Sequence, residues 1–282
     1  MLEVASGASL WQVELTEVGV YERSLPVGLE RIWENVLDWE HLPWLHRTSF
    51  AAIELEEASW DGWRARIGVD TAQGRATLRT EVALDRAALR YVTRTLDGPG
   101  KGTEISTRLI PEGARRTRIH VSFQLPPGDA ERLASAGERL VRAYQRLWDE
   151  DEAMMVRRQA ALDARGRSAG AAARQHAVSL GGLEELRPRL PLVIEAFGVR
   201  VRVLTEGGSL LAHSTRCPHL GGPLEEAPVT NGCVVCPWHG YRFDLRTGCS
   251  ADGRALALSP GLRVRVSEGS HEVLLERVVE PL

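Results

Sequence analysis

Two short cysteine–histidine pairs toward the C-terminal end carry the clearest chemical pattern in this sequence. Cys217 and His219 form the first pair, and after sixteen intervening residues Cys236 and His239 form the second. Thiolates and neutral imidazoles are the side-chain ligands that iron and zinc prefer. Two such pairs on separate loops can hold a metal centre from opposite sides, so the spacing predicts a metal site.

The pattern Cys-x-His…Cys-x2-His resembles the motif of Rieske [2Fe-2S] domains, in which two cysteines bind one iron and two histidines bind the other. The flanking strings Pro-His-Leu-Gly-Gly-Pro and Pro-Trp-His-Gly fit this resemblance. It implies that a [2Fe-2S] cluster is bound by four residues: Cys217, His219, Cys236 and His239. The alternative is a structural zinc site, because Cys233-x2-Cys236 also has zinc-like spacing.

The other two cysteines, Cys233 and Cys249, are interpreted as thiols outside the cluster. Rieske proteins of the respiratory type carry two further cysteines beside the ligands, where this sequence has Gly222 and Trp238. Their serine after the final glycine is replaced by Tyr241, which removes one hydrogen bond to sulfur and favours a lower potential. The resemblance is therefore to the oxygenase or ferredoxin type.

A second group of candidate ligands lies in the string ENVLDWEHLPWLH. His41 and His46 are five residues apart and follow a short predicted helix. With one carboxylate they would form a 2-His-1-carboxylate triad, which leaves positions on the metal open for O2. Taken alone, such a pair of histidines is more commonly structural, and that alternative stays open.

The third ligand is expected on a long helix near residue 150. Four consecutive acidic residues are the candidates: Asp149, Glu150, Asp151 and Glu152. Asp151 falls on the apolar stripe that contains Leu147, Trp148 and Met155. A buried carboxylate is costly unless it is paired, and a metal ion removes that cost. The periodicity therefore favours Asp151 and places the other three on the flanks or in solvent, although an acidic run is commonly a solvated face.

The spacing Asn-x2-Asp-x2-His-x4-His resembles the mononuclear iron motif of Rieske non-haem oxygenases. The resemblance implies that His41, His46 and Asp151 bind Fe(II). It also implies that Asp38 links His41 to a cluster histidine of a neighbouring subunit, and that Asn35 supports the site. A carboxylate at the end of a helix is the alternative role for Asp38.

The elements that must position these residues are visible in the pattern of apolar residues. Residues 11–23 predict a strand, 29–37 a helix, and 129–163 a long helix entered through Pro126-Pro127-Gly128. About six alternating strands lie between the two helices. Gly-Pro-Gly-Lys-Gly-Thr (98–103) has the composition of a phosphate loop, but flanking strands favour a hairpin turn. The order resembles the α+β helix-grip fold of START domains, pathogenesis-related proteins and the catalytic domains of Rieske oxygenases.

Three segments are expected. Residues 1–164 form the helix-grip catalytic domain, 165–178 a linker of small and basic residues, and 179–282 a small all-β Rieske domain. This order is the reverse of that in familiar oxygenase α subunits. The family's trimer, which pairs cluster and iron across subunits, is expected by resemblance, and pairing within one chain is the alternative.

Composition excludes several classes of protein. The 282 residues carry 35 Lys+Arg against 38 Asp+Glu, a net charge of -3, which gives no electrostatic footprint for nucleic acid. No apolar run approaches the roughly 18 residues that span a membrane, and the acidic N-terminal residues are unlike a signal peptide. We expect a cytoplasmic protein that binds neither nucleic acid nor membrane. No flavin or nicotinamide motif is present, so a separate reductase or ferredoxin is expected as electron donor.

The sequence thus predicts a Rieske oxygenase that uses a [2Fe-2S] cluster and mononuclear Fe(II) with O2 to hydroxylate or dealkylate an apolar small molecule, aromatic compounds included. The main alternative is not an enzyme: a helix-grip ligand-binding domain fused to a Rieske electron carrier. A third is an assembly subunit that docks on another oxygenase.

Overall fold

The computed structural model describes residues 14–71, 73–165 and 175–278, which form two compact units. The two units divide the long helix α3 (Ala130–Arg165) after Glu152. Residues 166–174, which make up most of the expected linker, lie outside the described residues, and the expected domain boundaries stay a prediction. Each unit is described by itself.

The first unit is built on a seven-stranded antiparallel sheet. Its strands are β1 (Thr16–Leu25), β2 (Ala52–Ser59), β3 (Gly62–Thr71), β4 (Gly74–Asp85), β5 (Arg90–Asp97), β6 (Glu104–Gly113) and β7 (Arg116–Leu125). Their order in the sheet is β1-β7-β6-β5-β4-β3-β2. Each strand from β2 to β6 thus pairs with the strand that follows it in the sequence, and β1 completes the sheet by pairing with β7. The six later strands expected from the sequence are confirmed. The opening strand, expected at 11–23, is observed at Thr16–Leu25, and residues 11–13 lie outside the described residues.

Alternating burial explains why these segments form strands. In β7, Ile119, Val121 and Phe123 are fully buried, while the residues between them are polar. One face of the strand therefore enters the core and the other remains accessible. The Gly-Pro-Gly-Lys-Gly-Thr segment joins β5 to β6, as the hairpin interpretation predicted. Gly98 has φ +88 there, and a Cβ at this position would lie 2.2 Å from the carbonyl oxygen of Thr77, so only glycine fits.

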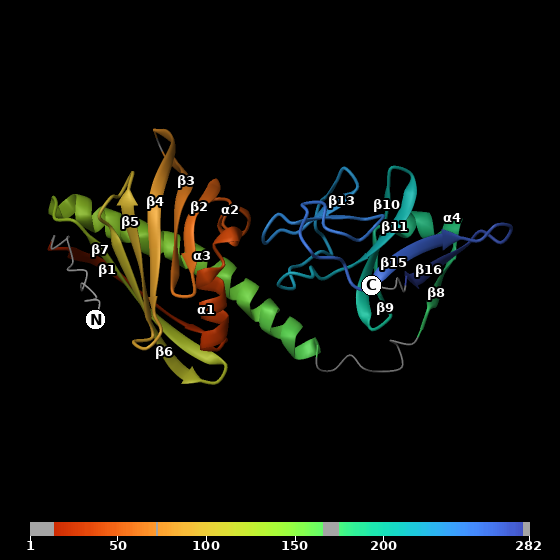
Figure 1. The fold of residues 1–282 in the computed structure, drawn as a ribbon, viewed down its shortest axis with the longest axis horizontal. Coiled ribbons are helices and arrows are strands. Elements are labelled where there is room, and N and C mark those ends of the chain that lie inside the picture. The colour runs from red at the N-terminus through yellow and green to blue at the C-terminus, as the bar shows by residue number, and fades with distance from the viewer. Residues whose placement is uncertain (1–13, 72, 166–174, 279–282) are drawn as a thin grey trace, which may run out of the picture. The chain divides into compact units, whose positions relative to one another are not determined.

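The part of helix α3 that belongs to this unit, up to Glu152, lies against one face of the sheet (Figure 1). The helix begins after Asp129, whose side chain accepts a hydrogen bond of 3.0 Å from the backbone N–H of Arg132 and so caps the first turn. Gly137 allows the closest approach to the sheet, because a Cβ there would lie 1.9 Å from the carbonyl oxygen of Val18 in β1. About two turns further on, Tyr144 packs edge-on against Phe123, with ring centroids 4.9 Å apart.

Short helices connect β1 to β2: α1 (Leu29–Leu37), the 3-10 turn η1 (Trp39–His41) and α2 (Leu42–Leu45). Helix α1 buries Ile32, Trp33 and Asn35. It is tied to the sheet because the indole N–H of Trp63 donates a 2.8 Å hydrogen bond to the carbonyl oxygen of Val36. Residues 40–45, which include α2, are grouped with the second unit. The antiparallel sheet, helix α1 and the long helix against the sheet form the helix-grip α+β fold that the sequence predicted.

In the second unit, which also contains Glu40–Leu45 and the end of α3 from Ala153, residues 175–278 form a small all-β domain, as expected. Its strands are β8 (Ala177–Gly182), β9 (Leu192–Ala196), β10 (Val199–Glu206), β11 (Ser209–Ser214), β12 (Val229–Thr230), β13 (Cys233–Val235), β14 (Arg242–Asp244), β15 (Gly261–Val266) and β16 (Glu272–Val278), with the short helical turns α4 (Leu183–Leu186) and η3 (Arg187–Arg189). They form three three-stranded sheets, β11-β10-β9, β12-β13-β14 and β15-β16-β8. Fully buried Val234 and Phe243 lie in the sheet β12-β13-β14. One candidate metal-binding loop connects β13 to β14.

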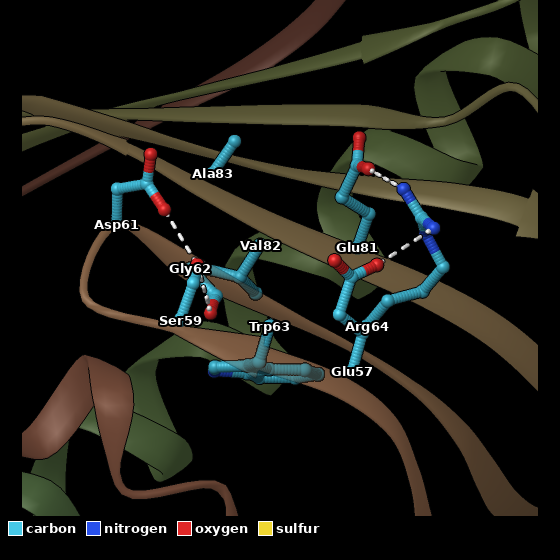
Figure 2. A pocket seen from close by; sticks show the side chains of 9 residues that line it. All are labelled: Glu57, Ser59, Asp61, Gly62, Trp63, Arg64, Glu81, Val82 and Ala83. Atoms are coloured by element: carbon cyan, nitrogen blue, oxygen red, sulfur yellow. Dashed lines mark hydrogen bonds and ion pairs between the residues drawn. The ribbon is translucent and has the colours of Figure 1, made fainter.

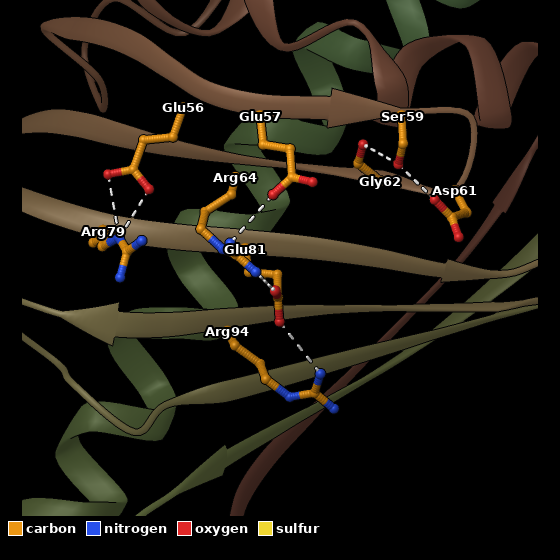
Figure 3. A network of polar contacts seen from close by, with 9 residues as sticks. All are labelled: Glu56, Glu57, Ser59, Asp61, Gly62, Arg64, Arg79, Glu81 and Arg94. Atoms are coloured by element: carbon orange, nitrogen blue, oxygen red, sulfur yellow. Dashed lines mark hydrogen bonds and ion pairs between the residues drawn. The ribbon is translucent and has the colours of Figure 1, made fainter. Parts of the chain in front are cut away.

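The accessible face of the first sheet carries a ladder of ion pairs across β2 to β5 (Figure 3). Arg64 donates to Glu81 at 2.6 Å and to Glu57 at 3.3 Å, and Glu56 accepts from Arg79 at 2.8 Å. A shallow depression lies beside it (Figure 2), lined by Glu57, Ser59, Asp61, Gly62, Trp63, Arg64, Glu81, Val82 and Ala83. Glu57, Arg64 and Glu81 are already paired with one another, and Asp61 accepts a hydrogen bond from Ser59. None of the predicted site residues lines the depression.

Within the described parts of the chain, no helix combines the length and apolar character needed to cross a membrane.

Candidate metal centres

The first candidate centre is formed by two loops of the second unit. One loop follows β11 and contains Cys217 and His219, and the other runs between β13 and β14 and contains Cys236 and His239. Strand pairing of β13 with β14 holds the ends of the second loop together. The fold thus brings to two neighbouring turns the four residues that the sequence motif selected.

The two loops close in the same way. In the first, Gly221 N–H donates to the carbonyl oxygen of Cys217 at 3.0 Å, and in the second, Gly240 N–H donates to that of Cys236 at 2.8 Å. Both glycines have positive φ, +87 and +67, a conformation that residues with a side chain rarely adopt. Each cysteine is therefore presented by a tight turn that ends in a glycine four residues later.

A second backbone hydrogen bond closes each loop. The N–H of Cys217 donates to the carbonyl oxygen of Gly222, and the N–H of Cys236 donates to that of Tyr241, both at 2.9 Å. The two backbone bonds per loop fix the Cα–Cβ direction of each cysteine. This shared geometry follows from the motif itself, in which a glycine stands four residues after each cysteine.

Three of the four side chains are buried, and His219 is half-buried beside them. Cys217, Cys236 and His239 are 1%, 0% and 4% exposed. The rings of His219 and His239 stand edge to face with centroids 4.6 Å apart, and the ring of Tyr241 lies 4.8 Å from that of His219. Sulfur and nitrogen ligands from both loops therefore converge on one place.

A hydrogen bond links the two thiols and shifts their pKa values in opposite directions. The hydrogen bond between them, together with burial, raises the pKa of Cys217. The same bond lowers the pKa of Cys236, and a hydrogen bond with His239 adds to this against the opposing effect of burial. One sulfur is thus already favoured as the thiolate, the form in which cysteine binds metal.

The residues fit a Rieske cluster in both chemistry and space. The donor set is two cysteines and two histidines, the set that holds the two irons of such a cluster. Gly222 leaves room for it, because a Cβ at this position would lie 2.7 Å from Sγ of Cys236 and 3.2 Å from the ring of Trp238. The position that holds a bridging cysteine in respiratory Rieske proteins thus has no space for a side chain here.

The remaining cysteines lie apart from this pattern. Cys233 is half-buried in β13, and Cys249 is exposed. All four cysteines are free of disulfides.

The second candidate centre combines His41, His46 and Asp151. Each offers one ligand atom, and these atoms all lie within 4.8 Å of one another. The side chains are buried, at 4%, 2% and 9% exposure. A buried cluster of two imidazoles and one carboxylate is a donor set suited to a divalent metal such as Fe(II).

Asn35 and Asp151 come together although they are 116 residues apart. Nδ2 of Asn35 donates a 2.9 Å hydrogen bond to Oδ1 of Asp151, and Nε2 of His46 lies 3.1 Å from the same oxygen. The amide thus orients the carboxylate toward the histidine. Asp38 ends helix α1, where its backbone N–H donates to the carbonyl oxygen of Asn35 at 3.1 Å.

The four consecutive acids of α3 have different surroundings. Asp149, with its side chain 67% exposed, and Glu152 both pair with Arg23 of β1, at 2.5 and 2.7 Å. Asp151 is directed inward, as its place on the apolar stripe indicated. Glu150 was expected on a flank or in solvent, yet its Oε2 lies 2.6 Å from Nδ1 of His46. The signal that could have found it is that a ligating histidine requires a partner for its second nitrogen.

The charges around His46 shift its pKa upward. Burial of the ring acts to lower the pKa, but the hydrogen bond with Asp151 and the negative charges of Asp151 and Glu150 outweigh it. Burial raises the pKa of Tyr91, against a hydrogen bond with Thr107 that lowers it. The Asp151 charge adds to this rise, so the phenol near the site stays protonated.

Comparison with known proteins gives the following matches. Residues 176–259 match the Rieske [2Fe-2S] domain. The chain is 31% identical over 97 residues to the anthranilate 1,2-dioxygenase ferredoxin subunit of Burkholderia cepacia, a match over 33% of this chain and 87% of that protein. It is 30% identical over 87 residues to the oxygenase component of 3-ketosteroid-9-alpha-monooxygenase of Rhodococcus rhodochrous, over 30% of this chain and 22% of that one.

The fraction of each protein's length that is covered differs widely among these matches. The chain spans only 8% of the length of the mouse and human apoptosis-inducing factor 3 proteins, with 39% identity over 49 residues. Among solved structures, Zhui aromatase/cyclase from Streptomyces sp. R1128 is similar at 18% identity and a TM-score of 0.40, over 55% of this chain and 98% of that one.

The matched range 176–259 contains both metal-binding loops, and the ferredoxin subunit is covered over nearly its whole length. Through its second unit, the chain belongs to the Rieske [2Fe-2S] domain family.

Proposed function

We propose that the protein is a Rieske-type oxygenase, in which a cluster held by Cys217, His219, Cys236 and His239 serves an Fe(II) held by His41, His46 and Asp151. The observation that carries the proposal is the presence in one chain of a Rieske domain and of a buried two-histidine, one-carboxylate group. A ferredoxin needs only the first. The second has no purpose in electron transfer alone, whereas an oxygenase that activates O2 requires it.

Asn35 and Asp38 would each have a role at this iron site. When bound, Fe(II) supplies the open coordination positions at which O2 is activated. Asn35 holds the Asp151 carboxylate in place through its 2.9 Å hydrogen bond. Asp38 is proposed as the link between His41 and the electron supply. The electrons come from a separate reductase or ferredoxin.

An apolar small molecule is the proposed substrate. The inward residues Ile119, Val121 and Phe123 of β7 are apolar and buried on the face of the sheet that packs against α3. A molecule admitted between the sheet and the helix would therefore meet an apolar surface. Such a surface binds by excluding water, and the polar groups that orient a ligand are then few. The 3-ketosteroid and sterol monooxygenases among the relatives act on molecules of this chemical class by their names.

Metal content tests the proposal directly. Anaerobically purified protein is expected to hold about three irons and two acid-labile sulfides per chain, with the EPR signal of a reduced Rieske cluster. The Asp151→Ala variant is expected to hold about two irons and to keep the sulfide and the EPR signal. Asp149→Ala, a change of the same kind at an exposed position of the same helix, is the matched control and should retain about three irons.

A wild-type protein with about two irons, which takes up no further Fe(II) on reconstitution, would contradict the oxygenase proposal. The protein would then be a Rieske electron carrier fused to a ligand-binding domain. Loss of substrate turnover in His41→Ala, with the cluster spectrum intact, is the second expected result.

A further inference from the structure

His46 lies between two carboxylates that come from neighbouring positions of α3. Its Nε2 faces Oδ1 of Asp151 at 3.1 Å, and its Nδ1 faces Oε2 of Glu150 at 2.6 Å. Consecutive residues of an α-helix point about 100° apart, so two adjacent acids can reach the two nitrogens of one imidazole. Each nitrogen of the His46 ring therefore faces a different carboxylate, Nδ1 that of Glu150 and Nε2 that of Asp151.

We infer that Glu150 is a positioning residue, which holds the Nδ1–H of His46 so that Nε2 is the nitrogen offered to the metal. This inference rests on the proposed mononuclear iron site. A neutral imidazole has one N–H donor and one lone pair, and the group bonded to the first decides which nitrogen carries the second. A carboxylate on the N–H also makes the ring a stronger ligand.

The contact has the character of a specific bond. Its length of 2.6 Å is at the short end for a charge-assisted hydrogen bond. His46 is only 2% exposed, so water has little access to replace Glu150 at Nδ1. The ring is also held by Phe50, which packs edge-on with centroids 6.1 Å apart. Phe50 thus restrains the ring plane, and Glu150 determines which nitrogen is protonated.

The surroundings of the neighbouring acids distinguish this role from a general structural one. Asp149 and Glu152 pair with Arg23, so they fasten α3 to β1. Glu150 instead contacts His46, with its side chain 37% exposed. A substitution at Glu150 should therefore affect the metal ligand while the helix stays attached to the sheet.

The test measures Fe(II) affinity in the full chain with its cluster intact. The mononuclear site is emptied with a chelator and titrated with Fe(II) by anaerobic calorimetry. We expect Glu150→Ala to weaken Fe(II) binding by about 10- to 100-fold, the usual effect of removing such a hydrogen-bond partner. Glu150→Gln keeps an oxygen that accepts from Nδ1–H, and should restore part of the loss.

Asp149→Asn is the matched control, because it removes one negative charge from the adjacent residue of the same helix. Its Fe(II) affinity should be that of the wild type. Equal affinity of Glu150→Ala and wild type, or an equal loss in Asp149→Asn, would overturn the inference. A wild type that binds no Fe(II) at all would instead refute the proposed function on which it rests.

A direct measurement of the nitrogen removes any dependence on how well the variants fold. With diamagnetic Zn(II) in the emptied site, the 15N shifts of the His46 ring should show a protonated Nδ1 and a metal-bound Nε2. A metal bound through Nδ1 would refute the assignment.

Discussion

Gly222 offers the sharpest test of the cluster-binding loops, because its replacement by alanine adds one methyl group at a known place. The new Cβ would lie 2.7 Å from Sγ of Cys236 and 3.2 Å from the ring of Trp238. An ordinary non-bonded contact is about 3.5–4.0 Å, so the sulfur or its loop must move by about 1 Å. Gly222 does not have a positive φ, so backbone strain does not confuse the result.

The expected size of the effect follows from this clash. Forcing a methyl group into a packed core costs about 1–3 kcal/mol. Since each 1.4 kcal/mol is a factor of ten, cluster binding should weaken by about 5- to 150-fold. The displaced atom is a cluster ligand, so the cost falls on the cluster-bound state more than on the free protein.

A competition experiment measures the ratio of the two proteins' affinities for the cluster. Tagged wild-type and untagged Gly222→Ala apoproteins share a limiting supply of iron and sulfide, are separated, and are compared by visible absorption and acid-labile sulfide. Gly261→Ala in β15 is the control, because a Cβ there meets its nearest atom, the Val278 carbonyl oxygen, at an ordinary 3.5 Å. Equal partition of the cluster between wild type and Gly222→Ala would refute the assignment of this loop.

Three further predictions concern stability, each read from unfolding midpoints. Asn35→Leu removes the donor to buried Asp151 and should destabilise the metal-free protein by about 1.5–3 kcal/mol; an unchanged midpoint would show that the bond is not formed. Burial lowers the pKa of His213 from its ordinary 6.5 to about 4. Below pH 6.5 the His213 ring therefore takes up a proton when the protein unfolds. Wild type should therefore lose about 1.4 kcal/mol more than His213→Gln between pH 7.5 and 5.5, and parallel losses would contradict this. Gly137→Ala should destabilise the first unit by about 1–3 kcal/mol through its clash with Val18, whereas a helix free of the sheet would be stabilised.

The local features of this protein were determined by the sequence itself. Strand alternation predicted the sheet, and the spacing of Cys217, His219, Cys236 and His239 with their flanking strings indicated two metal-binding loops. These features are local because a strand's faces and a tight turn depend on neighbours only a few residues away. For that reason the Rieske motif could be identified from the sequence.

The second site depended on tertiary structure. His46 and Asp151 are 105 residues apart, and helical periodicity could place Asp151 on the inner face without showing what it meets. The same periodicity put Glu150 on a flank, where the packed helix brings it to Nδ1 of His46. A helical wheel gives the angle between two residues but not the rotation of the helix against its sheet. That rotation follows from packing, including the close approach of Gly137 to β1, and it decides which acid serves which nitrogen.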